Sequence, residues 1–387
     1  MQVPTRRTPP TGAIVAAVAL AAMVALPAIL ARREAAPDAQ GSGAARPEGT
    51  GAPAPAADRT ASGALTGAPR EHGHELPLSA PHWYVTMHGE EGALSQVLAL
   101  DGTGAVLGPV LGALPTAEAP LDELRGMVVF GDGQLAVISA KSASSRAILF
   151  GAPDASTGVR PFRSVLVRRS TSNPAFVHPY QLAVGPEGAL YASNQDTNTI
   201  TRYEGMGSWF RGSPMQVPSG LSGFGTLLPG TVVPNDQQSP EGLNQARGFA
   251  FGPDGLLYAC DRGRGRIAAY DPRSGRLVRV VADAGAGIGH PIQLVFSRDG
   301  RPLLVTDNKH TGVWQVDLAT GRVHSLVRPG AGGLDAPSAI AERGDFVYVG
   351  SRLGKQVLKY DRHDGRFRGV FADLPSNPEF LVPVTQQ

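Results

Sequence analysis

The feature that most constrains this chain is a unit that recurs from about residue 83 to the end of the sequence. Its clearest copies span residues 245–283, 290–330 and 336–373, and each copy holds four short β-prone segments separated by turn residues. Four antiparallel strands in a unit of roughly 40–45 residues are typical of one blade of a β-propeller. The repeat therefore predicts an all-β propeller.

The turns within each copy have the residues that tight hairpins need. Gly252-Pro253-Asp254-Gly255 separates the first two strands of one copy, and Asp271 and Gly275 bracket the turn between its last two strands. Glycine accepts a positive φ, and aspartate can accept hydrogen bonds from the backbone that follows it. The 49 glycines and 33 prolines of the 387-residue chain fit a fold with many such turns.

The number of blades follows from the places where the repeat opens. Residues 83–112 contain only the last three strands of a unit, and residues 377–382 match the opening pattern at 290–295. We therefore expect the C-terminal strand to complete blade one, which hides the edges of an otherwise open ring. Openings at 123, 178, 245, 290, 336 and 377 give six blades. Seven blades are the alternative, if residues 205–244 hide a further one.

The N-terminus holds an uncharged apolar run of 19 residues, 13–31, with arginines on both sides. That length matches a helix that crosses a bilayer. We expect a signal anchor within residues 1–31, and a cleaved signal peptide is the alternative. The protein would then be anchored to the membrane facing the periplasm or the cell exterior, or secreted if the segment is cleaved.

Residues 32–80 are rich in alanine, glycine, proline and serine and have no periodicity. Such a segment cannot bury enough apolar surface to offset its ordering entropy, so we expect a flexible tether. The propeller then spans 81–387, with a long insertion at 205–244 that contains Trp209 and Phe210. This insertion either binds a partner or packs on its own propeller.

Composition excludes several classes of function. The formal net charge of +2 provides no field to recruit nucleic acid. A single cysteine, Cys260, permits neither an intrachain disulfide nor a CxxC site, and its place in a predicted strand beside Tyr258 indicates a buried thiol. No nucleotide-binding or serine-hydrolase motif occurs.

The motifs resemble a known group of propellers. Gly-Pro-Asp-Gly-x-Leu-Tyr followed by Asp-x-x-x-x-Arg-Ile, within residues 247–267, is similar to an NHL repeat, as is 180–203. Gly185-Pro186-Glu187-Gly188 also resembles virginiamycin B lyase. The resemblance covers the whole repeat region and implies a six-bladed propeller. It leaves the function open, because related propellers include gluconolactonase-like lactonases, amidating lyases and pure binding modules.

A propeller places the starts of all its first strands on one face, together with the loops between second and third strands. This face is the expected binding site. The repeat assigns it nine ligand-binding residues: Glu123, Arg125, His178, Tyr180, Arg247, His290, Gln293, Asn377 and Glu379. The loops add His88, Asn194, Asp196, Asp261, Arg262, Asp307, Asn308 and Arg352.

Two pairs in this set suggest chemistry. His178 and His290 hold the same place in two blades and are candidates to bind a divalent metal, Ca, Zn or Mg; alternatively each only stiffens a strand entry before proline. Arg125 and Arg247 are suited to bidentate capture of a carboxylate or phosphate, unless Glu379 pairs with one of them. Asp261 and Asp307 are expected to hold turns rather than to catalyse.

These features lead to one function hypothesis and two rivals. The leading hypothesis is a membrane-tethered binding module that takes a small molecule, peptide or protein at the channel face. The first rival is a metal-dependent hydrolase or lyase, lactonase-like or amidating-lyase-like, with its site on the same face. The second is a scaffold that uses the outer blade edges. The sequence favours binding because it contains no complete catalytic set.

Overall fold

The computed structural model describes residues 80–89, 95–203, 239–298, 300 and 302–384. The predicted signal segment, nearly all of the predicted tether and most of the 205–244 insertion lie outside these residues. Within the described part, no helix is long and apolar enough to cross a membrane.

The described residues form six antiparallel sheets, five of them with four strands. Blade one contains β23 (Pro378–Pro383), β1 (Trp83–Met87), β2 (Gln96–Leu100) and β3 (Val106–Pro109). Blade two contains β4 (Leu124–Val129), β5 (Leu135–Ser139), β6 (Arg146–Phe150) and β7 (Phe162–Arg168). Blade three has three described strands, β8 (Pro179–Val184), β9 (Leu190–Asn194) and β10 (Thr199–Tyr203).

The second half of the ring is regular. Blade four contains β11 (Ala246–Phe251), β12 (Leu257–Asp261), β13 (Arg266–Tyr270) and β14 (Leu277–Ala282). Blade five contains β15 (Pro291–Phe296), β16 (Leu303–Asp307), β17 (Gly312–Val316) and β18 (Val323–Val327). Blade six contains β19 (Pro337–Arg343), β20 (Phe346–Ser351), β21 (Gln356–Asp361) and β22 (Phe367–Asp373). Short 3-10 helices lie between strands at Thr116–Glu118, Ser142–Ser144, Ala284–Ala286 and Ala331–Gly333.

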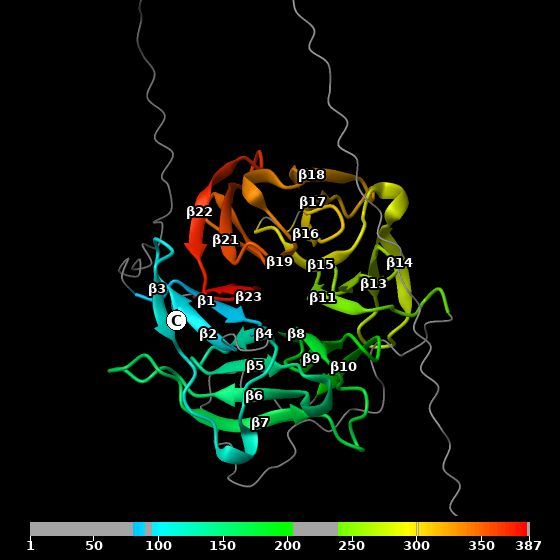
Figure 1. Cartoon of the computed structure of the whole chain (residues 1–387). Coiled ribbons are helices and arrows are strands. Elements are labelled where there is room, and N and C mark those ends of the chain that lie inside the picture. The colour runs from blue at the N-terminus through cyan, green and yellow to red at the C-terminus, as the bar shows by residue number, and fades with distance from the viewer. Residues whose placement is uncertain (1–79, 90–94, 204–238, 299, 301, 385–387) are drawn as a thin grey trace, which may run out of the picture. The chain divides into compact units, whose positions relative to one another are not determined.

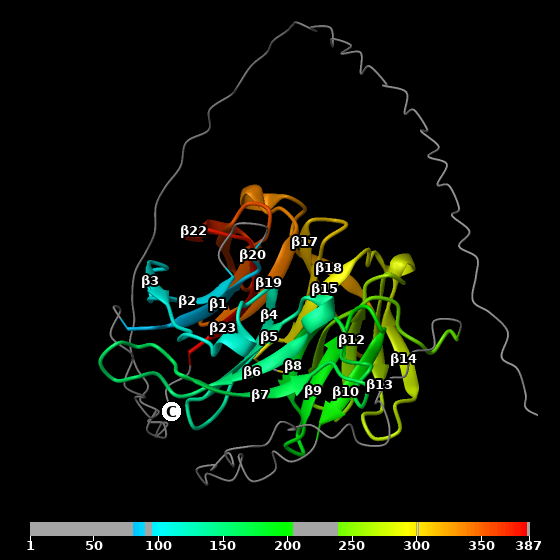
Figure 2. The same ribbon diagram turned by 60° about the horizontal axis from the view of Figure 1, so that its bottom comes forward.

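The C-terminal strand closes the ring as predicted. β23 pairs antiparallel with β1, with Tyr84 opposite Val382 and Val85 opposite Leu381. Figure 1 shows β23, in red, beside β1, in blue, with the first strand of every blade facing the axis. Figure 2 shows the same blades tilted, with β3, β7, β14 and β22 toward the outside. Six blades and the closing strand are therefore confirmed.

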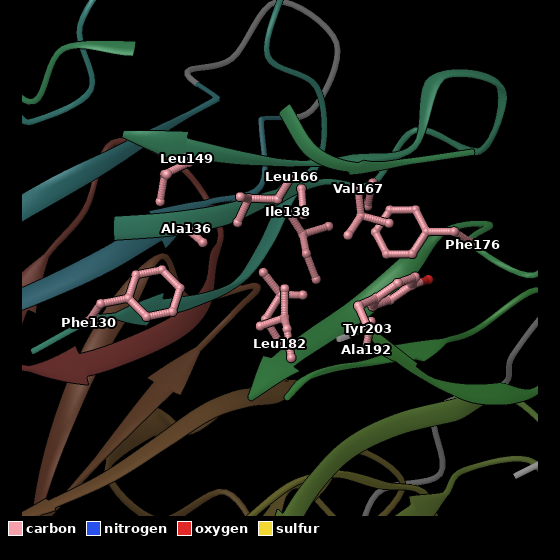
Figure 3. Packing of buried hydrophobic residues seen from close by; sticks show 13 residues of the cluster. Phe130, Ala136, Ile138, Leu149, Leu166, Val167, Phe176, Leu182, Ala192 and Tyr203 are labelled. Carbon is pink, nitrogen blue, oxygen red and sulfur yellow. The ribbon is translucent and has the colours of Figure 1, made fainter. Parts of the chain in front are cut away.

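The core lies between neighbouring blades because each sheet has two apolar faces. Phe130, Ile138 and Leu149 of blade two pack against Leu182 and Tyr203 of blade three (Figure 3). Burial of such side chains removes apolar surface from water at roughly 25 cal/mol per Å². This continuous packing explains how a fold of this size can do without disulfides. Cys260 belongs to the core between blades four and five, and burial raises the pKa of its thiol, as expected of an inert residue.

Glutamines connect the innermost strands of neighbouring blades. The Gln181 side chain donates to the carbonyl of Phe249 (2.7 Å) and accepts from its N–H (3.1 Å), so blade three is bonded to blade four. In the same way Gln293 accepts from the N–H of Ile340 in blade six (3.1 Å). Buried backbone groups need such partners.

Candidate functional site

The first strand of every blade breaks its pairing register one or two residues after it begins. A β-bulge of this kind changes the direction in which a side chain points. The residues at the breaks, in ring order, are Glu379, Arg125, Tyr180, Arg247, Ile292 and Ser338. These are the inner positions that the repeat predicted, one from each blade.

The residue before the strand is held in an uncommon conformation in four blades. Glu123, His178, Gln245 and Ala336 have φ of 51°, 48°, 56° and 46°. Left-handed backbone is costly for residues other than glycine and is kept where the surroundings enforce it, often at functional sites. Here the enforcing contacts come from the loop after the second strand. The N–H of Gln195 donates to the carbonyl of His178 (3.1 Å), and the N–H of Arg352 donates to that of Ala336 (3.3 Å).

Glu379 is the anionic centre of the site. Its carboxylate lies 3.6 Å from Nη1 of Arg125 and accepts a hydrogen bond from Nε of Arg352. Burial alone would raise the pKa of Glu379, but the charges of Arg125 and Arg352 hold it below its usual value. The structure thus confirms internal pairing for Arg125.

Two histidines contact the same guanidinium. Nη2 of Arg125 lies 2.9 Å from Nε2 of His178 and 3.3 Å from Nε2 of His88. Arginine can only donate, so both Nε2 atoms accept and each ring proton sits on Nδ1. Burial is the largest cause that lowers the pKa of His88, to about 4, and burial followed by the charge of Arg125 lowers the pKa of His178. Both rings are therefore neutral near pH 7.

His178 also lies against two carboxylates nearer to solvent. Its Nδ1 lies 3.2 Å from Oδ1 of Asp196, to which its proton can be donated, whereas its Nε2 lies 3.4 Å from Oε2 of Glu123 and, as an acceptor, forms no hydrogen bond with it. The exposed fraction of the side chains rises from the buried centre outward: Glu379 3%, Arg125 9%, His178 18%, Glu123 33% and Asp196 38%. The cluster therefore reaches from the interior to solvent on a single face.

Tyr180 lies between two arginines. The guanidinium carbon of Arg247 is 4.8 Å from the centre of its ring, and that of Arg125 is 5.4 Å away. The Tyr180 hydroxyl is buried without a hydrogen-bond partner in the described structure. Arg262, from the loop after β12, donates to the side-chain oxygen of Gln245. We call the following residues the mouth cluster: His88, Glu123, Arg125, His178, Tyr180, Asp196, Gln245, Arg247, Arg262, Arg352 and Glu379.

Six of the nine predicted ligand-binding residues belong to the mouth cluster. The other three have different places: Gln293 is 2% exposed and bonded to blade six, Asn377 is 2% exposed, and His290 borders the loop that Asp307 holds. His88, Asp196, Arg262 and Arg352 join the cluster from the loops after second strands. The sequence predicted that these loops lie on the binding face, but their residues were not among the nine predicted ligand-binding residues. Side chains in these loops do not follow the repeat, so the repeat does not show which of them reach the site.

The mouth cluster does not supply an evident metal site. Both ring nitrogens of His178 are already engaged by Arg125 and Asp196. Within the described residues, no three His, Cys, Asp or Glu side chains gather in a way that could hold a metal ion. A Ca, Zn or Mg site at His178 and His290 stays a prediction, and these residues alone do not form the donor set that it needs.

The loop aspartates have structural roles, as predicted. Asp261 pairs with Nε of Arg266 (2.8 Å) and accepts from the N–H of Asn244 (2.9 Å). Asp307 accepts from the N–H groups of Gly289 (2.6 Å) and His290 (2.8 Å). Each carboxylate thereby fixes the entry of a first strand into the ring.

Comparison with solved structures supports the fold. A chain of the nidogen–laminin complex matches with a TM-score of 0.53 and 15% identity, over 80% of this chain and 100% of that chain. The periplasmic gluconolactonase PpgL of Pseudomonas aeruginosa matches with a TM-score of 0.52 and 18% identity, over 79% and 99%. Virginiamycin B lyase of Staphylococcus aureus matches with a TM-score of 0.45 and 13% identity, over 80% of this chain and 86% of that chain. This TM-score is too low to carry an argument.

The sequence matches no protein-family model and no curated protein. The similarities to solved structures, together with the six sheets, confirm the six-bladed propeller architecture that the repeat indicated. At identities below one fifth they describe the fold alone, and any statement about activity has to come from the site.

Proposed function

We propose that this protein is a ligand-binding module that recognises a small molecule, peptide or protein through the mouth cluster. One observation carries the proposal: side chains from five blades meet on one face and form a charged group that runs from a buried centre to solvent. Desolvated charges and enforced backbone conformations are costly and concentrate at functional sites.

The contacts favour binding over acid–base chemistry. A general base needs a free lone pair near the substrate. The Nε2 lone pair of His178 accepts from Arg125, and its Nδ1 proton is donated to Asp196. The chain from Asp196 through His178 to Arg125 is thus suited to hold a guanidinium in one position.

The direct test is a ligand screen on the full-length protein, read by thermal unfolding and confirmed by calorimetry. We expect a ligand whose affinity falls at least about tenfold in Asp196→Ala and in Glu123→Gln, because both side chains lie at the solvent end of the cluster. Val278→Ser, on the outer strand β14, is the control and should bind normally. Loss of binding only in the outer-strand variant would support the scaffold hypothesis instead.

The enzyme hypothesis is tested separately. The name of the gluconolactonase PpgL makes a sugar lactone a reasonable trial substrate for this chain. We expect no stoichiometric metal in the purified protein and no hydrolysis of gluconolactone above background. Bound Ca, Zn or Mg that disappears in a His178→Ala/His290→Ala double variant, together with turnover, would refute the binding proposal.

The membrane tether is part of the same proposal. Residues 13–31 would anchor the propeller outside the cytoplasm, with residues 32–80 as a spacer. The chain should stay with membranes after carbonate extraction and should be degraded by protease added to intact spheroplasts. Recovery in the soluble extracellular fraction with residues 1–31 removed would instead identify a cleaved signal peptide.

A further inference from the structure

Positive and negative charges are distributed unevenly across the mouth cluster. On the side formed by blades six, one, two and three, Glu379 pairs with Arg125 and Arg352, and Glu123 and Asp196 flank His178. On the side formed by blade four, neither Arg247 nor Arg262 forms an ion pair with a carboxylate among the described residues; Arg247 contacts Tyr180, and Arg262 contacts Gln245. The excess positive charge is therefore local to blade four.

Arg247 is the least compensated cation of the cluster. It forms no hydrogen bond or ion pair within the described part of the chain, and its Nε is buried without a partner. Burial lowers its pKa to about 10, which still leaves the guanidinium charged at pH 7. A partly buried charge without a counter-ion is costly, and contact with one tyrosine ring offsets only a small part of that cost.

The nearby carboxylates are already committed to other partners. Glu379 is held by Arg125 and Arg352, and Asp261 by Arg266 and the N–H of Asn244. Asp307 accepts from the N–H groups of Gly289 and His290 before β15 and of Lys309 after β16. None of these three carboxylates forms an ion pair with Arg247; the charge of Glu379 acts on Arg247 but is shared with Arg125 and Arg352.

Arg262 is the second cation on the blade-four side of the mouth cluster. Its positive charge acts on Arg247, and its guanidinium is oriented by the neutral amide of Gln245. Guanidinium groups suit carboxylates and phosphates because each offers several N–H donors in a fixed plane. Tyr180 supports one face of the Arg247 group and limits its rotation.

We infer that Arg247 and Arg262 bind an anionic group of the ligand, a carboxylate or a phosphate, on the blade-four side of the mouth cluster. This inference rests on the proposed function and specifies the ligand class for that site. An anion at this position supplies the direct ion-pair partner that Arg247 does not have among the described residues, and the guanidinium groups provide its orientation. The neutral remainder of the ligand would then extend toward Glu123 and Asp196.

The test uses full-length protein in mild detergent, titrated with citrate and with inorganic phosphate at constant ionic strength. Calorimetry should detect binding of at least one of these anions, and thermal unfolding should shift upward with its concentration. The two titrations distinguish a carboxylate site from a phosphate site. Glycerol at equal concentration serves as the uncharged comparison and should produce no heat of binding.

Arg247→Gln should weaken anion binding at least about tenfold, and Arg262→Gln should weaken it several-fold. Arg279→Gln is the matched control, because Arg279 also lies over a tyrosine ring but on the outer strand β14. Arg247→Lys keeps the charge without the planar fork and should bind between the wild type and Arg247→Gln. If Arg247→Gln fails to fold, Arg247→Lys and Arg262→Gln carry the test.

Unchanged affinity in the Arg247 and Arg262 variants, or no anion binding up to millimolar concentration, would overturn the inference. The proposed function fails in a different way. If a screened neutral ligand still loses affinity in Asp196→Ala while the anions do not bind, the mouth cluster remains the binding site and only the anionic class is wrong.

Discussion

At the scale of single residues, Glu379 has the largest effect on the site because it holds two arginines and comes from the last strand. Glu379→Gln removes the counter-charge of Arg125 and Arg352 while keeping the side-chain shape. Loss of one partner from a buried pair leaves uncompensated charge, so we expect about 3 kcal/mol of destabilisation. Chemical denaturation of the wild type and the variant measures this loss in the free energy of unfolding.

The control for this prediction is an ion pair on the surface. Asp364 lies 3.2 Å from Arg366, and both side chains are exposed. Asp364→Asn should cost less than about 1 kcal/mol, because solvent screens exposed pairs. Equal effects of the two substitutions would mean that Glu379 is not the buried centre described above.

The lowered pKa of His88 predicts how the stability of the fold depends on pH. Its pKa in the folded protein is about 4, below the ordinary 6.5, mainly because of burial. Between these values the unfolded chain binds a proton that the folded chain does not, so the free energy of unfolding falls as the pH falls from 6.5 to 4. Allowing for partial solvation, His88 alone contributes on the order of 2 kcal/mol of this loss.

His88→Gln should flatten that part of the pH profile, as measured by urea denaturation at several pH values. The free energy of unfolding of the variant should still fall slightly with falling pH, because the pKa of His178 is also lowered. The matched control is His324→Gln on the outer strand β18, where the side chain is exposed. A profile as steep in His88→Gln as in the wild type would contradict the assignment.

The sequence predicted which side chains face the axis but not how they pair. Arg125 and Arg247 occupy equivalent repeat positions and are each followed by glycine, so their local patterns are the same. Their neighbours around the ring differ: Arg125 lies between Glu379 and Tyr180, whereas Arg247 lies between Tyr180 and Ile292. Only the order of the blades in the closed ring reveals that one arginine is paired and the other is not.

At the scale of strands, the glycines after these arginines let neighbouring inner strands approach. A Cβ on Gly248 would lie 2.8 Å from Cα of Gln293 on β15, and one on Gly126 would lie 2.7 Å from Cα of Gln181 on β8. Contacts this short with backbone force the strands apart. Gly248→Ala should therefore destabilise the fold by about 2 kcal/mol.

A second glycine provides the comparison. Gly131 lies in the turn after β4, and a Cβ added to it would have no other atom within 4 Å. Gly131→Ala should change the free energy of unfolding by less than about 0.5 kcal/mol. The difference between the two variants, measured by thermal or urea unfolding, tests the close packing of β11 against β15. Equal stability of both variants would contradict it.

The residues of the hairpin turns made the strands predictable from the sequence. Asp271 accepts from the N–H groups of Arg273 and Ser274, and Gly275 has a φ of 69°, as the turn pattern required. The links between blades were not predictable in this way. Gln181 bonds a strand 68 residues away, and a single glutamine in a strand carries no signal of such a contact.

At the scale of the whole molecule, one strand both closes the fold and completes the site. Apart from β23, every sheet is built from strands consecutive in sequence. β23 pairs with β1 from the other end of the propeller and places Glu379 between Arg125 and Arg352. Closure therefore removes an open sheet edge and supplies the central carboxylate at the same time.

The repeat made this closure predictable because blade one lacks a first strand and the C-terminus carries an unmatched one. The chemistry of the site was less predictable, since it depends on which blades become neighbours. The closed ring is thus the central claim, because the positions of all residues in the mouth cluster follow from it.

Hydrogen exchange of the C-terminal strand tests that claim most directly. We predict that the amides of Phe380 and Val382, which face β1 in the register of the pair, exchange as slowly as those of β1, through global unfolding only. The amide of Asp254, in the exposed turn after β11, provides the fast reference. Exchange of Phe380 and Val382 at the rate of that turn, while β1 stays protected, would show that the ring is open and would contradict the account.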